Sequence, residues 1–196
     1  GTLTRGEPEV TDVILGKASP AGPASEDALL ALAAGVERRS EHPLARAIIK
    51  KAQKRQLKFP EVSDARSLTG AGAQAQIDGV TVFVGNPALF EDQLRLSLGD
   101  LASDIHRLQS DGKTVVIVGS DQAPWGLLAL RDNLRPDARN AIKGLHDIGV
   151  RRVVMLTGDN PRTAQVIASE AGIDEVYADL KPEDKVAKVR EITVAS

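Results

Sequence analysis

The chain has 196 residues, enough for one good hydrophobic core and a smaller second lobe, and its 25 basic and 27 acidic side chains leave a formal net charge of −2. This balance offers no basic field for nucleic acid or an anionic membrane surface, and the absence of cysteine excludes disulfides, thiolate catalysis and sulfur-ligated metal sites. The longest apolar stretch, Ala28 to Val36, is far shorter than the roughly 20 residues that span a bilayer.

The front of the chain predicts a linker followed by two helices. Residues 16–25 mix Gly, Pro, Ser and Ala, a composition typical of a linker or domain crossing. Ser25 can cap a helix from about residue 27 to 39, and Pro43 in a first-turn position opens a second helix to about residue 56. The two helices meet at His42.

The middle of the chain predicts antiparallel strands. Asp78-Gly79, a dipeptide typical of two-residue hairpin turns, separates apolar segments over 71–77 and 80–84. Beyond this hairpin we expect helices over 87–94 and 98–109, and then a second hairpin made of 115–118 and 125–130.

The tail alternates between helices and apolar strands, which indicates parallel βαβ units. The expected order is helix 136–148, strand 152–156, helix 161–171, strand 175–178 and helix 182–192. The fold class is therefore α/β: an open α/β unit of residues 1–14 and 121–196, with an antiparallel α+β unit of residues 15–120 inserted into it.

The strand that ends at Thr157-Gly158-Asp159 places a hydroxyl, a flexible backbone and a carboxylate at the carboxyl edge of a parallel sheet, where such folds bind ligands. A phosphate suits this position, with the amides that open the next helix nearby. Lys185, in the first turn of the last helix, could reach the same phosphate. The alternatives are an ordinary capped turn and a solvated lysine.

Two features of the inserted unit also suit a ligand. His42 precedes a proline, which holds it out of helical geometry at a helix entrance, although an isolated histidine is more often structural. Gly70 and Gly72 would let a ligand approach the backbone, or would shape a bulge. His106 and His146 have no partners at ligand spacing, so no protein metal site is predicted.

Two nucleotide-binding signatures fail. Gly70, Gly72 and Ala75 fit a loose dinucleotide fingerprint, but the segment continues as a strand rather than as the helix that the fingerprint requires. No Walker A sequence occurs, which excludes the P-loop class.

Taken together, the motifs resemble the cytoplasmic ATP-processing region of heavy-metal-transporting P-type ATPases over almost the whole chain. Residues 1–4 resemble the end of the family's Asp-Lys-Thr-Gly-Thr-Leu-Thr phosphorylation motif, and residues 40–44 (Ser-Glu-His-Pro-Leu) resemble a motif of the heavy-metal branch. The remaining matches are Gly70-x-Gly72, Gly85-Asn86, Thr157-Gly158-Asp159 and Pro182-Glu183-Asp184-Lys185. The last two resemble motifs of haloacid-dehalogenase-like phosphotransferases. The resemblance thus implies an incomplete haloacid-dehalogenase-like phosphorylation domain with an inserted nucleotide-binding domain.

The resemblance also implies roles for single residues. The ATP site would comprise Glu37 at the adenine amino group, His42 orienting the nucleotide, and Gly70, Gly72, Gly85 and Asn86 along the cleft. At the phosphoryl site, Thr157 and Gly158 would contact the transferred group, Lys185 would neutralise its charge, and Asp159 would assist with Mg²⁺ or domain closure.

The family's nucleophilic aspartate would lie just before Gly1 and its magnesium-binding motif after Ser196, so we expect a piece of a longer pump that binds ATP without completing the cycle. The implied partners are ATP and the pump's own transmembrane and actuator domains, and the implied location is the cytoplasmic side of a bacterial inner membrane. Met155 to Asn160 and Asp174 to Lys185 look closer to zinc, cadmium or cobalt exporters than to copper pumps.

Two other classes stay open. A free-standing haloacid-dehalogenase-like phosphatase with an inserted cap would need an Asp-x-Asp nucleophile motif, which neither the start of the chain nor residues 11–13 supply. A regulatory nucleotide-sensing or protein-interaction module would bind a protein partner tightly.

Overall fold

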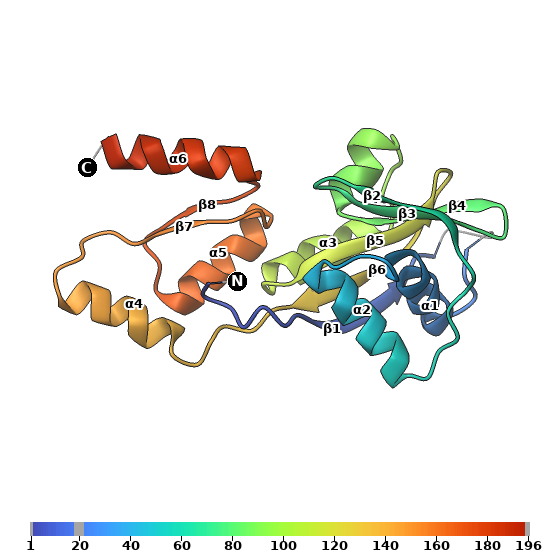
Figure 1. Cartoon of the computed structure of the whole chain (residues 1–196), viewed down its shortest axis with the longest axis horizontal. Helices are drawn as coiled ribbons and strands as arrows, with labels where there is room; N and C mark the ends of the chain where they lie inside the picture. The colour runs from blue at the N-terminus through green and yellow to red at the C-terminus, as the bar shows by residue number, and fades with distance from the viewer. Residues whose placement is uncertain (1, 18–21, 195–196) are drawn as a thin grey trace.

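The computed structural model describes residues 2–17 and 22–194, and these residues form two lobes of unequal size (Figure 1). The larger lobe holds a six-stranded antiparallel sheet in the order β1-β6-β5-β4-β3-β2. Its elements are β1 (Glu9–Leu15), α1 (Glu26–Glu37), α2 (Pro43–Lys54), β2 (Ser63–Leu68), β3 (Gly72–Ile77), β4 (Val80–Gly85), a π-helical turn η1 (Leu89–Gln93), α3 (Leu101–Ser110), β5 (Thr114–Ser120) and β6 (Pro124–Arg131).

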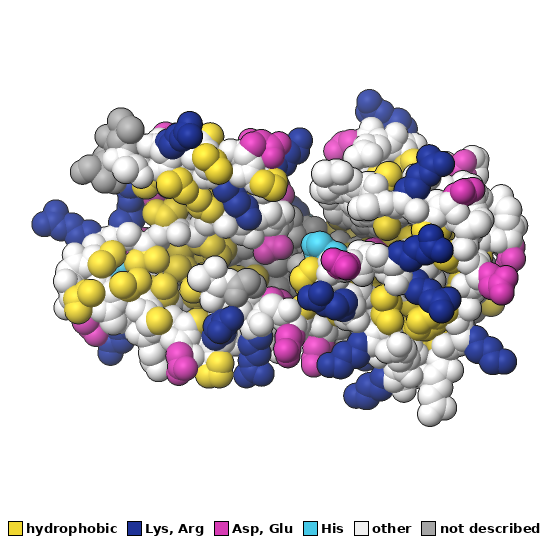
Figure 2. Space-filling view, viewed as in Figure 1, with side chains coloured by type: hydrophobic (Ala, Val, Ile, Leu, Met, Phe, Trp, Pro, Cys, Tyr) yellow, Lys and Arg dark blue, Asp and Glu magenta, His cyan; other side chains and the backbone are white. Residues whose placement is uncertain are grey.

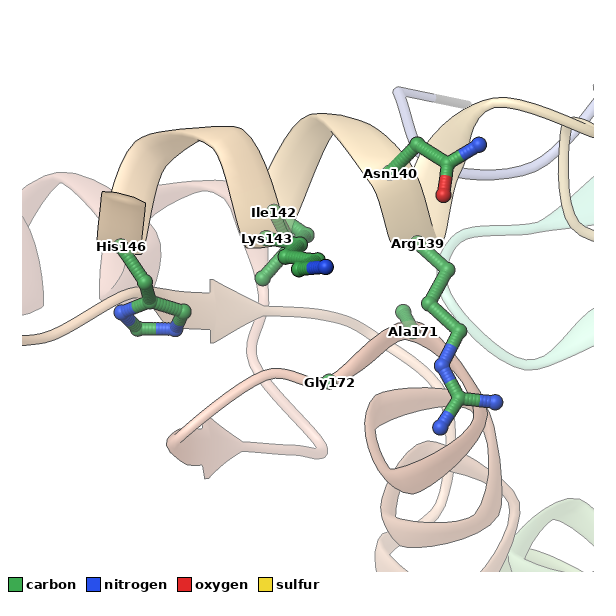
Figure 3. Close-up of a pocket in the computed structure, with 7 residues that line it drawn as sticks. All are labelled: Arg139, Asn140, Ile142, Lys143, His146, Ala171 and Gly172. Atoms are coloured by element: carbon green, nitrogen blue, oxygen red, sulfur yellow. The ribbon is translucent and has the colours of Figure 1, made fainter. Parts of the chain in front are cut away.

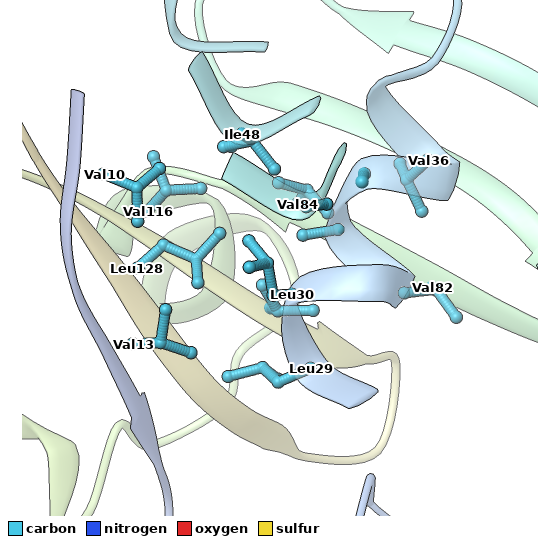
Figure 4. Close-up of a cluster of buried hydrophobic side chains, with 14 of the residues drawn as sticks. Val10, Val13, Leu29, Leu30, Val36, Ile48, Val82, Val84, Val116 and Leu128 are labelled. Atoms are coloured by element: carbon cyan, nitrogen blue, oxygen red, sulfur yellow. The ribbon is translucent and has the colours of Figure 1, made fainter. Parts of the chain in front are cut away.

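Helices cover both faces of this sheet, because its central strands are apolar on both sides. Along β5, Val116 and Val118 point into the core beneath α1 and α2, whereas Val115 and Ile117 point into the core beneath α3 and η1. Figure 4 shows the first of these cores, in which side chains of β1, β4, β5 and β6 meet those of the two helices.

The smaller lobe is built around a two-stranded parallel sheet. Its elements are α4 (Ala138–Asp147), β7 (Val154–Leu156), α5 (Pro161–Ala171), β8 (Glu175–Tyr177) and α6 (Pro182–Val194). In Figure 1, α6 lies on one side of the strands, and α4 and α5 lie on the other. The βαβ order predicted for the tail is confirmed, as is the α/β class with an antiparallel sheet.

Two antiparallel segments join the lobes. The backbone N–H of Arg5 donates to the carbonyl of Asn133 at 3.0 Å, and that of Arg135 donates to the carbonyl of Leu3 at 2.9 Å. The N–H of Gly6 lies 3.1 Å from a carboxylate oxygen of Asp132. The chain therefore passes between the lobes twice, through two short segments that pair with each other, residues 3–6 and 132–135; we call them the paired strip.

The sheet crosses both predicted domain boundaries. Strand β1 extends across residues 14 and 15, and β6, which pairs with both β1 and β5, lies beyond residue 120. Divisions at those positions would separate paired strands of a single sheet. We therefore propose that the lobes divide near residues 5–8 and 131–134.

The predicted linker is not a crossing between lobes. Of residues 16–25, residues 18–21 lie outside the part of the chain that the structure describes. The described flanks connect β1 to α1, and both elements belong to the larger lobe. The N–H of Lys17 donates to the carboxylate of Asp100 at 2.6 Å, so the front of the loop is fixed against the start of α3.

Some predicted elements differ in kind or extent. The helix expected over 87–94 is the short π-helical turn η1, the helix expected from 98 begins at Leu101, and β2 was not predicted. No helix among residues 2–17 and 22–194 has the length and apolar character needed to cross a bilayer.

Candidate functional site

The Thr157–Asp159 loop follows β7 at the carboxyl edge of the parallel pair. The hydroxyl of Thr157 donates to a carboxylate oxygen of Asp159 at 2.9 Å, and the N–H of Asp159 returns a hydrogen bond to that hydroxyl at 3.1 Å. A Cβ added to the exposed Gly158 would lie 3.3 Å from the carbonyl oxygen of Leu180. The predicted cluster is thus a compact, hydrogen-bonded turn pressed against a second loop.

This second loop follows β8 and contains a carboxylate that sequence reasoning missed. The N–H of Asp179 donates to the carbonyl of Asp159 at 2.9 Å, and the N–H of Leu180 donates to the carbonyl of Thr157 at 3.0 Å. Burial raises the pKa of Asp179, and the neighbouring charge of Asp159 raises it further. The usable signal was the parallel order of β7 and β8, which brings their carboxyl ends to one edge.

Lys185 extends the same edge. It lies half-buried in the first turn of α6, whose start is fixed by the hydrogen bond from the N–H of Lys181 to the carboxylate of Asp184 at 3.0 Å. Within the described part of the chain, no carboxylate lies within ion-pair distance of its ammonium group.

In the larger lobe, Glu37 ends α1 and is only 9% exposed. Burial raises the pKa of its carboxyl group, and a hydrogen bond with Ser40 partly opposes that rise. A buried carboxylate with few partners is poised to accept a hydrogen bond from a donor on a ligand.

His42 caps α2. Its backbone is extended, and its Nδ1 accepts a hydrogen bond from the N–H of Leu44 at 3.2 Å. This bond assigns the proton of a neutral ring to Nε2, which leaves Nε2–H as a donor on an exposed side chain. Glu37 and His42 therefore flank one short turn, with an acceptor and a donor respectively.

The predicted glycines and Asn86 form a second cluster, where β3 pairs with β4. A Cβ at Gly72 would lie 2.1 Å from the carbonyl oxygen of Val84, and one at Gly85 would lie 2.4 Å from that of Ala71. The amide of Asn86 donates to the carbonyl of Gly70 at 3.1 Å. Close backbone approach between the paired strands thus accounts for Gly72 and Gly85, and the register of β3 and β4 runs through this pair without a bulge.

The structure brings together four of the six expected nucleotide contacts in this second cluster and the other two at the α1–α2 turn. Among the described residues, no hydrogen bond joins the two groups. In Figure 2, basic side chains are spread over the larger lobe, and hydrophobic side chains gather over the smaller lobe between α4 and α6.

The cavities lie elsewhere. One of about 310 Å³ lies between α4 and the end of α5 (Figure 3) and is lined by Arg139, Asn140, Ile142, Lys143, His146, Ala171 and Gly172. A second of about 410 Å³ lies at the edge of the sheet and is lined by Glu61, Val62, Ser63, Gln76, Asp78 and Gly79. None of the predicted site residues lines either of these two cavities.

Comparison with known proteins assigns the class. The profile of the haloacid dehalogenase-like hydrolase family matches residues 1–195, and the chain belongs to that family. A copper-transporting P-type ATPase of Rhizobium leguminosarum bv. viciae is 44% identical over 192 residues, which cover 98% of this chain and 22% of the relative. The chain thus spans about a fifth of that relative's length.

Two solved structures narrow the relationship. The structure of a zinc-transporting PIB-type ATPase in an E2.Pi state matches with a TM-score of 0.64 and 40% identity, covering 100% of this chain and 30% of that one. The catalytic domain of the CPx-ATPase CopB-B matches with a TM-score of 0.73 and 26% identity, covering 100% and 64% respectively. The resemblance to heavy-metal P-type ATPases is confirmed, with relatives named for different metals.

Proposed function

We propose that this chain is the ATP-binding catalytic region of a P-type ATPase that transports a heavy-metal cation, and that ATP held by the larger lobe phosphorylates an aspartate of the pump. The observation that carries the proposal is the meeting of the Thr157–Asp159 and Asp179–Lys181 loops at one sheet edge. The related catalytic domain of CopB-B changes conformation upon nucleotide binding, which supports a nucleotide as the ligand of this chain.

The larger lobe would hold the nucleotide. The buried carboxylate of Glu37 suits the adenine amino group, which is a donor, and Nε2–H of His42 suits an acceptor on the nucleotide. At the glycine cluster, the missing side chains would let ATP approach the backbone of Gly70 and Gly72, beside Gly85 and Asn86.

The smaller lobe would hold the transferred phosphoryl group. The hydroxyl of Thr157 would turn from the carboxylate of Asp159 and donate a hydrogen bond to a phosphoryl oxygen. Gly158 would leave room for that oxygen, and Lys185 would neutralise its charge. Asp159 and Asp179 fit Mg²⁺, which is commonly bound through one or two carboxylates together with phosphates. When bound, Mg²⁺ would offset the negative charge of the phosphates.

The cargo is proposed as a heavy-metal cation, with zinc, cadmium or cobalt as the expected set and copper as the alternative. The membrane-spanning and actuator domains of the pump would be the partners, and the chain would lie on the cytoplasmic side of a bacterial inner membrane. The chain alone would bind ATP without sustained turnover.

Calorimetric titration of ATP and of GTP tests the proposal. We expect saturable binding that prefers ATP, because Glu37 would select the adenine amino group. Replacing His42 with alanine or serine should weaken ATP binding roughly tenfold or more, about the contribution of one hydrogen bond to a charged group.

The serine variant is the matched control for folding. Serine retains the helix cap, so His42→Ser should keep wild-type stability, whereas His42→Ala should lose about 1 kcal/mol. A folded chain that binds neither nucleotide would contradict the proposal, and so would a His42→Ser variant that binds ATP as tightly as the wild type.

A further inference from the structure

Helix α5 contacts both lobes. Thr163, Val166 and Glu170 are spaced so that they share one face of this helix. This face lies against residues 112 and 113 in the turn that connects α3 to β5 in the larger lobe. The contact is separate in sequence from the paired strip that joins the lobes at residues 3–6 and 132–135.

The contact combines a buried hydrogen bond with close packing of the backbone. Thr163 is 1% exposed, and its hydroxyl donates to the carbonyl of Lys113 at 2.7 Å. A Cβ at Gly112 would lie 2.8 Å from a methyl carbon of Val166, so the turn approaches the helix closely. Residue 112 has a φ of +74°, which glycine adopts without strain.

An ion pair joins the lobes at the C-terminal end of α5. The guanidinium of Arg131 donates to both carboxylate oxygens of Glu170, at 2.6 and 2.9 Å, and also to the carbonyl of Asp111 at 3.0 Å. Arg131 ends β6, so one side chain joins the sheet, the turn and α5. Nη2 of Arg131 makes both contacts with Glu170, while Nη1 donates to Asp111, so the two ends of one guanidinium hold the helix and the turn together.

The same helix continues directly from the candidate phosphoryl loop. Asn160, which follows Asp159, caps α5, and its side-chain amide donates to the hydroxyl of Thr163 at 2.7 Å. The hydroxyl thus accepts from Asn160 and donates to Lys113. The ammonium group of Lys113 in turn contacts Asp12 of β1 at 2.7 Å. A continuous chain of contacts therefore runs from the phosphoryl loop to the large sheet.

We propose that Thr163, supported by the Arg131–Glu170 pair, is a positioning residue that fixes the orientation of the two lobes relative to each other. The consequence for catalysis rests on the proposed function: the contact would keep the Thr157–Asp159 loop aligned with nucleotide held by the larger lobe. The contact is made by residues of this chain alone, so a distance measurement tests it without any measurement of ATP binding.

Distance measurement between spin labels tests the proposal. The chain has no cysteine, so Gln53→Cys in α2 and Arg190→Cys in α6, both at exposed positions, would carry the only two labels. Thr163→Val keeps the side-chain shape but removes both hydrogen bonds. We expect this variant to populate label distances outside the wild-type peak. The ratio of these distances to the wild-type peak should rise by roughly 5- to 150-fold.

Three variants serve as comparisons. Thr163→Ser should restore the wild-type distribution because it keeps the hydroxyl, a rescue that packing alone would not give. Thr193→Val is the matched control, since the hydroxyl of Thr193 donates to the carbonyl of Val189 within α6 and, among the residues that the structure describes, makes no bond to the larger lobe. Glu170→Gln should broaden the distribution in the same direction as Thr163→Val.

The outcomes are decisive without any measurement of nucleotide binding. An unchanged distance distribution in a folded Thr163→Val chain would overturn the proposal, and so would failure of Thr163→Ser to restore the wild-type peak. If Thr163→Val does not fold, as judged by circular dichroism, Glu170→Gln decides: a broadened distribution supports the positioning role and a wild-type one overturns it.

Discussion

At Gly72 two backbone constraints act on one residue. Its φ of +153° is strained for other residues, and an added Cβ would lie 2.1 Å from the carbonyl oxygen of Val84. We expect Gly72→Ala to lower the free energy of unfolding by roughly 2–4 kcal/mol in urea denaturation. Gly79→Ala is the control, since Gly79 has a positive φ but open space, and should cost about 1 kcal/mol. Equal losses would show that the close approach is relieved by a shift of β4.

Glu37 makes stability depend on pH. Because burial raises its pKa above the usual value near 4.5, the folded state binds the proton more tightly than the unfolded state does. The stability gained from protonated Glu37 is present below pH 4.5 and is lost as the pH rises through the pKa of the folded state. Glu37→Gln should therefore be more stable than the wild type near neutral pH and should lack this dependence.

Denaturation of both proteins at several pH values between acid and neutral checks this expectation. Glu41→Gln, at an exposed position in the same turn, is the matched control and should follow the wild-type profile. A Glu37→Gln profile parallel to that of the wild type would mean that the buried carboxyl is compensated in the folded state. ATP titration of the same variant should separately show weakened binding under the proposed function.

The sequence predicted the positions of single functional or structural residues where neighbouring residues in the chain determine their conformation. The glycine pair permits backbone conformations that other residues avoid, and the proline after His42 restricts the backbone before it, so both features could be found from sequence. Asp179 and Thr163 were missed because their roles depend on residues far away in the chain, although the predicted parallel order of β7 and β8 could have pointed to Asp179. Asp179 matters because two parallel strands end together, and Thr163 matters because its partner, Lys113, lies 50 residues earlier.

At the scale of elements, residues that favour the start or end of a helix allowed its first and last residues to be predicted accurately. Helix α5 has Pro161 in its first turn and Gly172 in a left-handed conformation after its end, and its predicted range of 161–171 is confirmed. Strand β2 lacked such signals, since Ser63–Leu68 is a mostly exposed edge strand with no apolar alternation. The π-helical turn η1 was predicted as a longer helix because nothing in 87–94 indicates where the hydrogen-bonding pattern changes.

At the scale of the whole molecule, the sequence favoured the correct class, but both of the domain boundaries it suggested fall between paired strands of one sheet or within one of them. Strand β1 pairs with β6, whose residues lie more than 110 positions later, and no local signal specifies such a pairing. The proline- and glycine-rich composition of residues 16–25 indicated a boundary, whereas the described residues on either side, 16–17 and 22–25, adjoin β1 and α1 of the larger lobe. Composition identifies loops, and pairing between distant strands decides which loops separate lobes.

The division near residues 5–8 and 131–134 predicts which segment folds alone. Residues 9–131 contain all six strands and both cores, whereas residues 15–120 lack nearly all of β1 and the whole of β6. Without β6, the apolar β5 becomes an exposed edge, and the buried side chains of Leu127, Leu128 and Leu130 are lost. At roughly 2–5 kcal/mol for each large apolar side chain removed, the shorter segment should not fold.

Circular dichroism during urea denaturation of both segments checks this prediction. We expect residues 9–131 to unfold in one cooperative transition and residues 15–120 to show none, because cooperativity requires a sheet with both faces covered and its central strands paired. Residues 1–131 are the control for the added N-terminal strip, which finds its partners at residues 132–135 and should leave the transition unchanged. A cooperative transition in residues 15–120 would place the boundary inside the sheet and make β1 and β6 an attachment of the smaller lobe.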